Sequence, residues 1–189
     1  IQYSAFSGCS SLTSITIQNG VTSISNYAFS GCRSLTSIVV AESNKVYHSF
    51  KNCLIETQRK TLILGCKNSE IPLDGSVTSI GNYAFSGCSG LTSITIPDSV
   101  TSIGYSAFED CKSLTSITIP ESVTSIGSSA FVNCSSLTGI TFEDTSTWYT
   151  TTNKADWTNK SGGTVVDVSD PTKNATTFRN SGRNYWYKL

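Results

Sequence analysis

The sequence has no methionine, one histidine and four prolines, and charged residues make up only 14% of it, well below the usual quarter. Thirteen basic residues balance thirteen acidic residues, so the formal net charge at pH 7 is zero. A chain without excess positive charge has no long-range field that would collect nucleic acid or an anionic membrane. We therefore expect no nucleic-acid partner.

Long hydrophobic runs are absent as well. No stretch approaches the run of about 18 apolar residues that a membrane-spanning helix needs, so we expect no membrane span in this chain. No signal peptide is visible either. Because the chain opens inside a repeat unit, described below, we expect any export signal to lie outside it.

The usual motifs of catalysis and cofactor binding are missing too. There is no Cys-x₂₋₄-Cys pair for zinc, no G-x-S-x-G elbow and no glycine-rich phosphate loop. The one histidine, His48, has no nucleophile motif near it and is expected at the surface. The sequence therefore predicts a protein that is not an enzyme and that has no cofactor or metal.

What the sequence does contain is a repeat with a period of 23 residues. The unit LTSITIPDSVTSIGYSAFEDCKS, at residues 91–113, recurs with small changes at 114–136 and 12–34, and it begins again at Leu35 and Leu137. One unit cannot bury its apolar side chains alone, whereas stacked units close a continuous core. The apolar positions in this unit are Leu91, Ile94, Ile96, Val100, Ile103, Ala107, Phe108 and Cys111.

Local structure within the unit follows from its residue types. The short β-branched Leu-x-x-Ile-x-Ile segment predicts a strand, and stacked coils would pair these strands in parallel into one long sheet. Residues 100–103 predict a second, shorter extended segment after a turn. Residues 105–110 predict a single helical or 3₁₀ turn that buries Phe108.

The pattern L-x-x-I-x-I-P-x-x-V-x-x-I-G-x-x-A-F-x-x-C resembles the BspA-type, or Treponema-type, bacterial leucine-rich repeats, over about residues 1–142. The resemblance implies a right-handed leucine-rich-repeat solenoid with a parallel sheet on its concave side. It also implies a cell-surface or secreted protein, often of host-associated bacteria, that attaches to host or neighbouring-cell proteins. Five Ala-Phe-x-x-Cys signatures support it, beginning at Ala5, Ala28, Ala84, Ala107 and Ala130.

Residues 42–71 break the register of the repeat. Two apolar runs, 52–55 and 61–64, predict a β-hairpin. The segment also gathers basic residues, which are either a solvated surface or a contact patch for an acidic partner. These residues are Lys45, Lys51, Arg59, Lys60 and Lys67. Cys53 and Cys66 flank the hairpin and could form a disulfide, if geometry allows.

The repeat stops at Glu143, and all three tryptophans follow it: Trp148, Trp157 and Trp186. We expect residues 143–189 to form a small β-rich C-terminal cap over the apolar face of the last coil. A hairpin near 164–168 and a final strand at 184–187 are expected within it. A carbohydrate-binding aromatic cluster is the alternative interpretation.

Five cysteines recur at the repeat period and should form one internal column: Cys9, Cys32, Cys88, Cys111 and Cys134. Metal binding or disulfide formation would be a functional interpretation. Their spacing instead favours buried thiols that pack as small hydrophobic side chains.

The third and fifth positions of the Leu-x-x-Ile-x-Ile strand should point away from the core and form a stripe of small side chains on the concave sheet. This stripe either keeps the surface soluble or forms a broad platform for a protein ligand. The candidate binding face consists of Ser14, Thr16, Ser37, Val39, Ser93, Thr95, Ser116, Thr118, Gly139 and Thr141. We expect an adhesin-like binding module; a structural spacer and an ice- or crystal-binding array are the alternatives.

Overall fold

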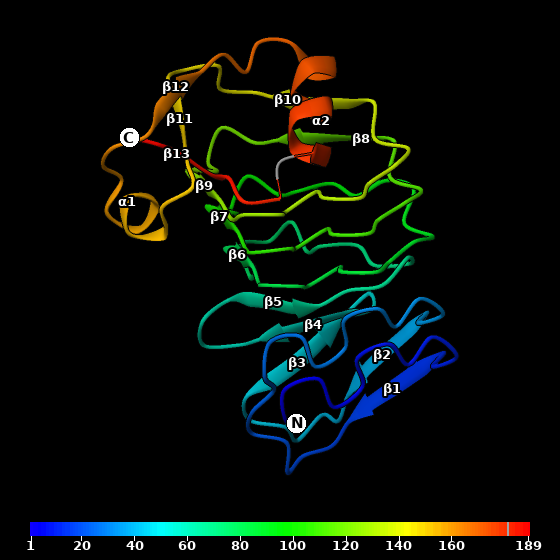
Figure 1. Cartoon of the computed structure of the whole chain (residues 1–189). Helices are drawn as coiled ribbons and strands as arrows, with labels where there is room; N and C mark the ends of the chain where they lie inside the picture. Colours follow the sequence, from blue (N-terminus) through cyan, green and yellow to red (C-terminus); the bar gives the residue numbers. More distant parts are fainter. Residues whose placement is uncertain (181) are drawn as a thin grey trace.

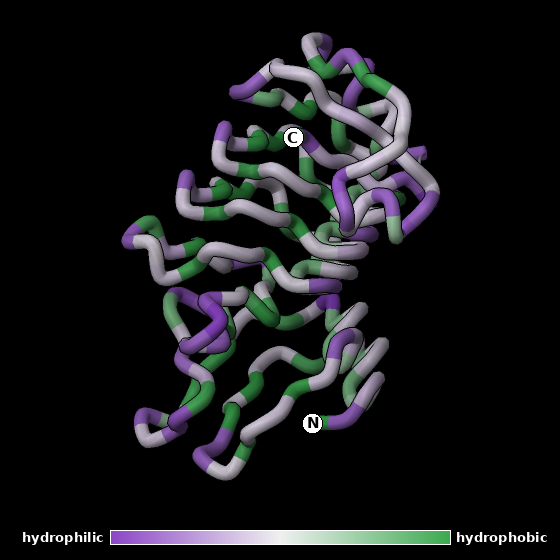
Figure 2. The backbone as a smooth tube through the Cα atoms, turned by 90° about the vertical axis from the view of Figure 1, so that its left-hand side faces the viewer, coloured by the Kyte–Doolittle hydropathy of each residue, from purple (hydrophilic) through white to green (hydrophobic). Residues whose placement is uncertain are grey.

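The chain winds into stacked coils, with an irregular hairpin near one end and the last 47 residues folded against the other (Figure 1). A computed structural model describes residues 1–180 and 182–189. The predicted solenoid is confirmed: it has about six turns with coils of about 23 residues. Figure 2 shows hydrophobic and hydrophilic residues recurring at matching places from one coil to the next.

The Leu-x-x-Ile-x-Ile segment forms strands in four coils, namely β1 (Ser14–Ile17), β2 (Ser37–Val40), β8 (Ser116–Ile119) and β10 (Gly139–Phe142). The pairs β1–β2 and β8–β10 are parallel and in repeat register, so that Ser14 lies opposite Ser37 and Ser116 opposite Gly139. Equivalent residues of neighbouring coils therefore stack on each other, as the 23-residue period predicts.

These strands do not join into the single long sheet that the sequence led us to expect. Residues 91–96 are not part of a strand, and the two-stranded sheets lie on either side of them. One repeat before Thr95 the chain has Pro72. Proline has no N–H to donate to a neighbouring strand, so the ladder is interrupted there.

The continuous sheet is built instead on the second, shorter extended segment of each coil. β6 (Ser79–Ile80), β7 (Ser102–Ile103) and β9 (Ser125–Ile126) pair in parallel. The bend after these strands brings neighbouring coils very close: a Cβ on Gly127 would lie 2.5 Å from the backbone nitrogen of Tyr105. Only glycine fits such an approach.

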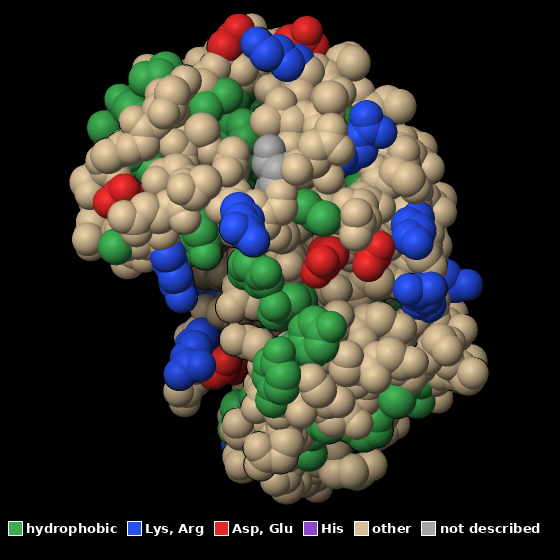
Figure 3. Space-filling view, in the orientation of Figure 1, with side chains coloured by type: hydrophobic (Ala, Val, Ile, Leu, Met, Phe, Trp, Pro, Cys, Tyr) green, Lys and Arg blue, Asp and Glu red, His purple; other side chains and the backbone are tan. Residues whose placement is uncertain are grey.

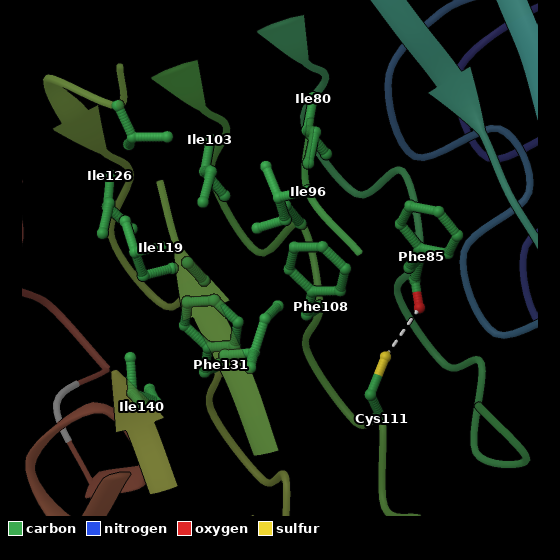
Figure 4. Packing of buried hydrophobic residues seen from close by; sticks show 14 of the residues in the cluster. Ile80, Phe85, Ile96, Ile103, Phe108, Cys111, Ile119, Ile126, Phe131 and Ile140 are labelled. Atoms are coloured by element: carbon green, nitrogen blue, oxygen red, sulfur yellow. Dashed lines mark hydrogen bonds between the residues drawn. The ribbon is translucent and has the colours of Figure 1, made fainter. Parts of the chain in front are cut away.

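The Ala-Phe-x-x-Cys turns stack into an aromatic column inside the coils (Figure 4). The rings of Phe85 and Phe108 are nearly parallel with centroids 5.1 Å apart, and Phe108 and Phe131 repeat this geometry at 5.2 Å. Phe108 is fully buried, as predicted. Centroid distances of this size are typical of favourable aromatic pairs in protein interiors.

The cysteine column lies beside these rings. Each buried thiol of this column donates to a carbonyl of the preceding coil, for example Cys111 to Phe85 at 3.2 Å and Cys134 to Phe108 at 3.0 Å. Cys9 is exposed and the other six cysteines are buried. All seven are free thiols, including Cys53 and Cys66, so the possible disulfide between those two is not formed.

The irregular segment contains the predicted hairpin and one further strand. β4 (Cys53–Glu56) pairs antiparallel with β5 (Thr61–Leu64), as expected, and β3 (Tyr47–Phe50) also pairs antiparallel with β4. β5 then pairs in parallel with β6 and so joins the solenoid sheet. Figure 1 shows β1, β2 and β3 inclined to the coils above them, and the buried residues form two separate clusters.

Residues 143–189, called the cap below, contain β11 (Trp148–Thr151), α1 (Lys154–Asn159), β12 (Thr164–Val166), α2 (Pro171–Asn180) and β13 (Tyr185–Lys188). β13 pairs antiparallel with both β9 and β11, which extends the sheet to nine strands. The final strand was predicted. The two helices were not, although Asp170 before Pro171 is a typical helix start, with the Asp170 carboxylate accepting from the Thr172 N–H.

The cap packs its aromatic side chains on the last coil. The ring of Phe178, on α2, meets Phe131 edge-on at 5.6 Å and stacks on Trp186 at 4.2 Å. Trp148 and Trp186 are buried, while Trp157 is half-buried. Two of the three tryptophans therefore serve the core, which argues against a carbohydrate-binding cluster of all three.

Candidate functional site

The predicted stripe lies on the outer face of the Leu-x-x-Ile-x-Ile segments. The residues of the stripe are exposed, except that Ser37 and Gly139 are half-buried. The buried partners alternate with them: Ile117 and Ile119 point inward beside Ser116 and Thr118. The stripe is divided into one part on β1–β2 and another on β8–β10, with Ser93 and Thr95 on the interrupted segment between them.

Threonines elsewhere on the coils differ from those of the stripe in their hydrogen bonds. The Thr36 hydroxyl donates to the Thr13 carbonyl of the previous coil at 3.1 Å, and Thr138 donates in the same way to Thr115. Thr101 and Thr124 do so on the other segment. These hydroxyls are part of the ladder between coils.

The stripe hydroxyls take no part in that ladder. Over residues 1–180 and 182–189, no hydrogen bond joins the side chains of Thr16, Thr95, Thr118 or Thr141 to another protein group. Their donors and acceptors face solvent. Such groups can exchange water for a partner without breaking bonds within the solenoid.

The five basic residues of the irregular segment are not brought together. Arg59 and Lys60 lie in the turn between β4 and β5, whereas Lys51 lies in the turn between β3 and β4, at the other end of these strands. Lys67 follows β5 toward that same end, and Lys45 precedes β3 at the first end. The predicted basic patch is therefore divided into two small groups of residues, one at each end of these strands.

Acidic side chains also compensate part of this charge. Lys51 pairs with Glu70, and Arg59 pairs with Glu56 at 3.5 Å. Both basic side chains are more than half exposed, so these ion pairs contribute little to stability. The histidine beside them, His48, is half-buried and shares a hydrogen bond with the Thr57 hydroxyl at 2.8 Å.

A hollow that the sequence did not predict opens between the β4–β5 turn and the cap (Figure 3). Its volume is about 330 Å³. Arg59 of the irregular segment and Trp157 of the cap both line it, together with the serines of β6 and β7 and the glycines that follow these strands. Figure 3 shows basic side chains on both margins. The hollow depends on the hairpin and the cap approaching each other, and no local pattern indicates that.

A row of tyrosines borders the hollow. The rings of Tyr3, Tyr27, Tyr83 and Tyr105 follow one another at centroid distances of 5.5, 4.7 and 5.3 Å. Burial raises the pKa of Tyr83 well above its ordinary value, so its phenol stays protonated. The signal was present in the sequence, because each tyrosine lies one or two residues before an Ala-Phe pair.

The described residues lack the features of a membrane span and of a metal site. They contain no helix with the length and apolar composition to cross a bilayer. Nor do they contain a cluster of three or more histidine, cysteine or acidic side chains placed to hold a metal ion.

Comparison with protein families decides the classification. The model of the BspA-type leucine-rich-repeat region matches residues 1–60 and 59–155, in six copies. This chain belongs to the BspA-type leucine-rich-repeat family. The resemblance read from the Ala-Phe-x-x-Cys signatures is therefore confirmed. Members of this repeat family are generally non-enzymatic binding proteins. A comparison with curated protein sequences finds no match.

Solved structures of bacterial leucine-rich-repeat proteins are similar to this BspA-type chain. A leucine-rich-repeat protein from Eubacterium ventriosum is 31% identical over 70% of this chain and 36% of its own, with a TM-score of 0.62. The pneumococcal vaccine antigen PcpA, at 19% identity, covers 69% of this chain and 39% of its own with a TM-score of 0.55, and so shares the fold.

A leucine-rich cell surface protein from Faecalibacterium prausnitzii is 26% identical over 82% of this chain and 52% of its own, with a TM-score of 0.45. The chain thus spans between 36% and 52% of the length of these three proteins.

Proposed function

We propose that this chain is an adhesin-like binding module of a bacterial cell-surface or secreted protein, which engages a host or neighbouring-cell protein through the outer face of its coils. The stripe of unbonded hydroxyls carries this proposal. A side chain kept only for the stability of the solenoid would bond to the previous coil, as Thr36 and Thr101 do. The stripe side chains leave these groups free along successive coils.

The energetics of such a surface favour many modest contacts. Each hydroxyl that exchanges water for a partner contributes about 1 kcal/mol or less, and the stripe has no tryptophan or arginine to concentrate binding energy. Affinity would therefore come from area and from repetition along the coils. Family membership supports the same conclusion, because these repeats are found in proteins that bind other proteins.

The test is a binding screen of the chain against an array of purified extracellular-matrix and bacterial surface proteins. A variant with Thr16→Lys, Thr95→Lys and Thr118→Lys places three long charged side chains on the stripe. It should lose the interaction, whereas Thr152→Lys, an equally exposed threonine of the cap, should retain it.

A structural spacer is the competing function, and the same screen separates the two. A spacer would bind nothing on the array. Binding that survives the triple lysine substitution would place the interface elsewhere on the molecule and would reject the stripe as its location.

A further inference from the structure

A groove opens where the strand ladder is interrupted between β2 and β8. Its volume is about 530 Å³, and it is lined by residues 69–74, by residues 93–95, by Phe50 at the end of β3 and by Lys51 in the following turn. Phe50 is 41% exposed and Leu73 is 75% exposed. Large apolar side chains that face water beside a groove of this size mark an interaction site.

Backbone groups on one wall of this groove are open. Among the residues that the structure describes, the N–H and C=O groups of residues 93–96 bond to no other protein group. The facing segment cannot complete a ladder with them, because Pro72 lacks an N–H. An extended segment with unpaired, solvent-facing backbone groups is a template for the addition of another strand.

The charges around the groove are unequal. Glu70 pairs with Lys51, while the Asp74 carboxylate accepts from Ser76, whose N–H lies 2.9 Å from it, and forms no ion pair with a described residue. One negative charge therefore stays without a cation among the described residues. A basic residue of a ligand would complement it, at the edge of the apolar surface.

The groove overlaps the stripe, because Ser93 and Thr95 belong to both. The stripe provides hydroxyls over a long surface but no large side chain. The groove adds apolar surface at the middle of a stripe in which Val39 is the one exposed aliphatic side chain among the described residues. An apolar residue inserted in a pocket at the centre of an interface is where binding energy usually concentrates.

We propose that this groove binds an extended peptide segment of a protein partner, which adds as a strand along residues 93–96. A large apolar side chain of the segment lies between Phe50 and Leu73, and a basic side chain beside it faces Asp74. The identification of the segment as part of a surface-protein ligand rests on the proposed function; the peptide-binding groove itself does not.

Selection from a display library of random short peptides tests the proposal, with the intact chain as bait and the Leu73→Asp variant as counter-bait. Peptides retained by the chain alone should combine a large apolar residue with a neighbouring lysine or arginine. Their dissociation constants, measured by fluorescence anisotropy, should rise about tenfold or more in Leu73→Asp. Amide hydrogen exchange at residues 93–96 should slow when the peptide is bound.

Two further variants separate main-chain recognition from side-chain recognition. Thr95→Pro removes one backbone N–H at a position where the previous coil already has proline, and it should weaken binding. Thr95→Val keeps that N–H and removes only the hydroxyl, so it should weaken binding less than Thr95→Pro does. Val165→Asp is the matched control for Leu73→Asp, because Val165 is a similarly exposed apolar side chain (62%) on the cap.

Equal enrichment of peptides on the chain and on Leu73→Asp would overturn the proposal, as would an unchanged affinity in Thr95→Pro. Failure here would leave the proposed function standing if the lysine-substituted stripe still lost its protein ligand. Peptide binding without any protein ligand on the array would instead support the groove and reject the adhesin-like function.

Discussion

Gly65 lies against the ring of Phe85. A Cβ on Gly65 would be 2.0 Å from Cε1 of that ring, and the Gly65 N–H donates to the Ala84 carbonyl at 2.8 Å. Phe85 is stacked on Phe108 on its other side. The phenylalanine column therefore ends on a glycine, because the irregular coil has no Ala-Phe turn and only bare backbone fits over the ring.

Gly65→Ala should destabilise the chain by about 1–3 kcal/mol, since the methyl group can be accommodated only if the Phe85 ring moves. The free energy of unfolding in urea measures this. Gly20→Ala is the control, because a Cβ at Gly20 meets no atom within 4 Å. Equal stability of the two variants would show that the coils separate more easily than their packing indicates.

Phe108→Ala should cost about 3–5 kcal/mol, since it leaves a cavity between two stacked rings. Thr118→Ala, at an exposed stripe position, should cost little. Denaturation midpoints of the two variants provide the comparison. Similar midpoints would contradict the assignment of Phe108 to the inside and Thr118 to the outside.

That assignment came from the sequence alone, because a strict period reports which residues of successive coils share an environment. The same argument located Cys111 beside the Phe column. It could not show which extended segment forms the continuous sheet, since residues 93–96 pair with neither neighbouring coil, and Pro72 gives a local reason on one side only.

The hollow and the groove required tertiary information. Arg59 and Trp157 line one hollow although they lie in the irregular coil and the cap, and neither has a periodic counterpart. Phe50 and Leu73 line the groove together, and the sequence pattern does not indicate this either. The helix that begins at Pro171 could have been predicted from the sequence, because an Asp-Pro pair is a typical signal for the start of a helix.

Thiol reactivity should be confined to one cysteine in the folded chain. Burial raises the pKa of Cys32 to about 11 and the pKa values of Cys53 and Cys134 to about 12, so few thiolates form at these positions near pH 8. Cys9 is exposed. Titration with a chromogenic disulfide reagent should modify one of the seven thiols rapidly, and Cys9→Ser should remove that phase.

The stability of the cap should depend on pH through Asp144. The hydrogen bond from the buried Lys188 ammonium lowers the pKa of Asp144 from 3.8 to about 2. A carboxyl whose pKa is lower in the folded state stabilises it above the unfolded pKa and loses that effect as the pH falls toward the folded pKa. Asp144→Asn should therefore cost about 1 kcal/mol at pH 7, and the difference should vanish between about pH 4 and pH 2.

Thermal unfolding followed by tryptophan fluorescence measures this difference, because Trp148 and Trp186 are buried in the cap. The control is Asp98→Asn, an exposed carboxylate that forms no ion pair among the described residues. A constant difference between Asp144→Asn and the unmodified chain over the whole pH range would reject the ion pair as the cause.

The two classes of threonine should separate stability from binding. Replacing Thr36, Thr101, Thr124 and Thr138 together by valine removes four hydroxyls that donate to the previous coil. These bonds are exposed to solvent, so each contributes near the low end of its range, and the sum should be about 2 kcal/mol. Thr36 and Thr138 share no partner, which favours additive losses, whereas Thr124 donates to the Thr101 carbonyl, so the losses at these two positions are coupled.

Replacing Thr16, Thr95, Thr118 and Thr141 by valine should have the opposite outcome. These hydroxyls bond to no protein group over the described ranges, so the free energy of unfolding should stay within about 0.5 kcal/mol of the unmodified value per residue. Capture of a protein ligand by the stripe should nevertheless weaken, because its hydrogen-bonding groups are gone while the shape is kept. If both quadruple variants lost stability equally, the stripe hydroxyls would belong to the scaffold, and the reason to assign them to a partner would disappear.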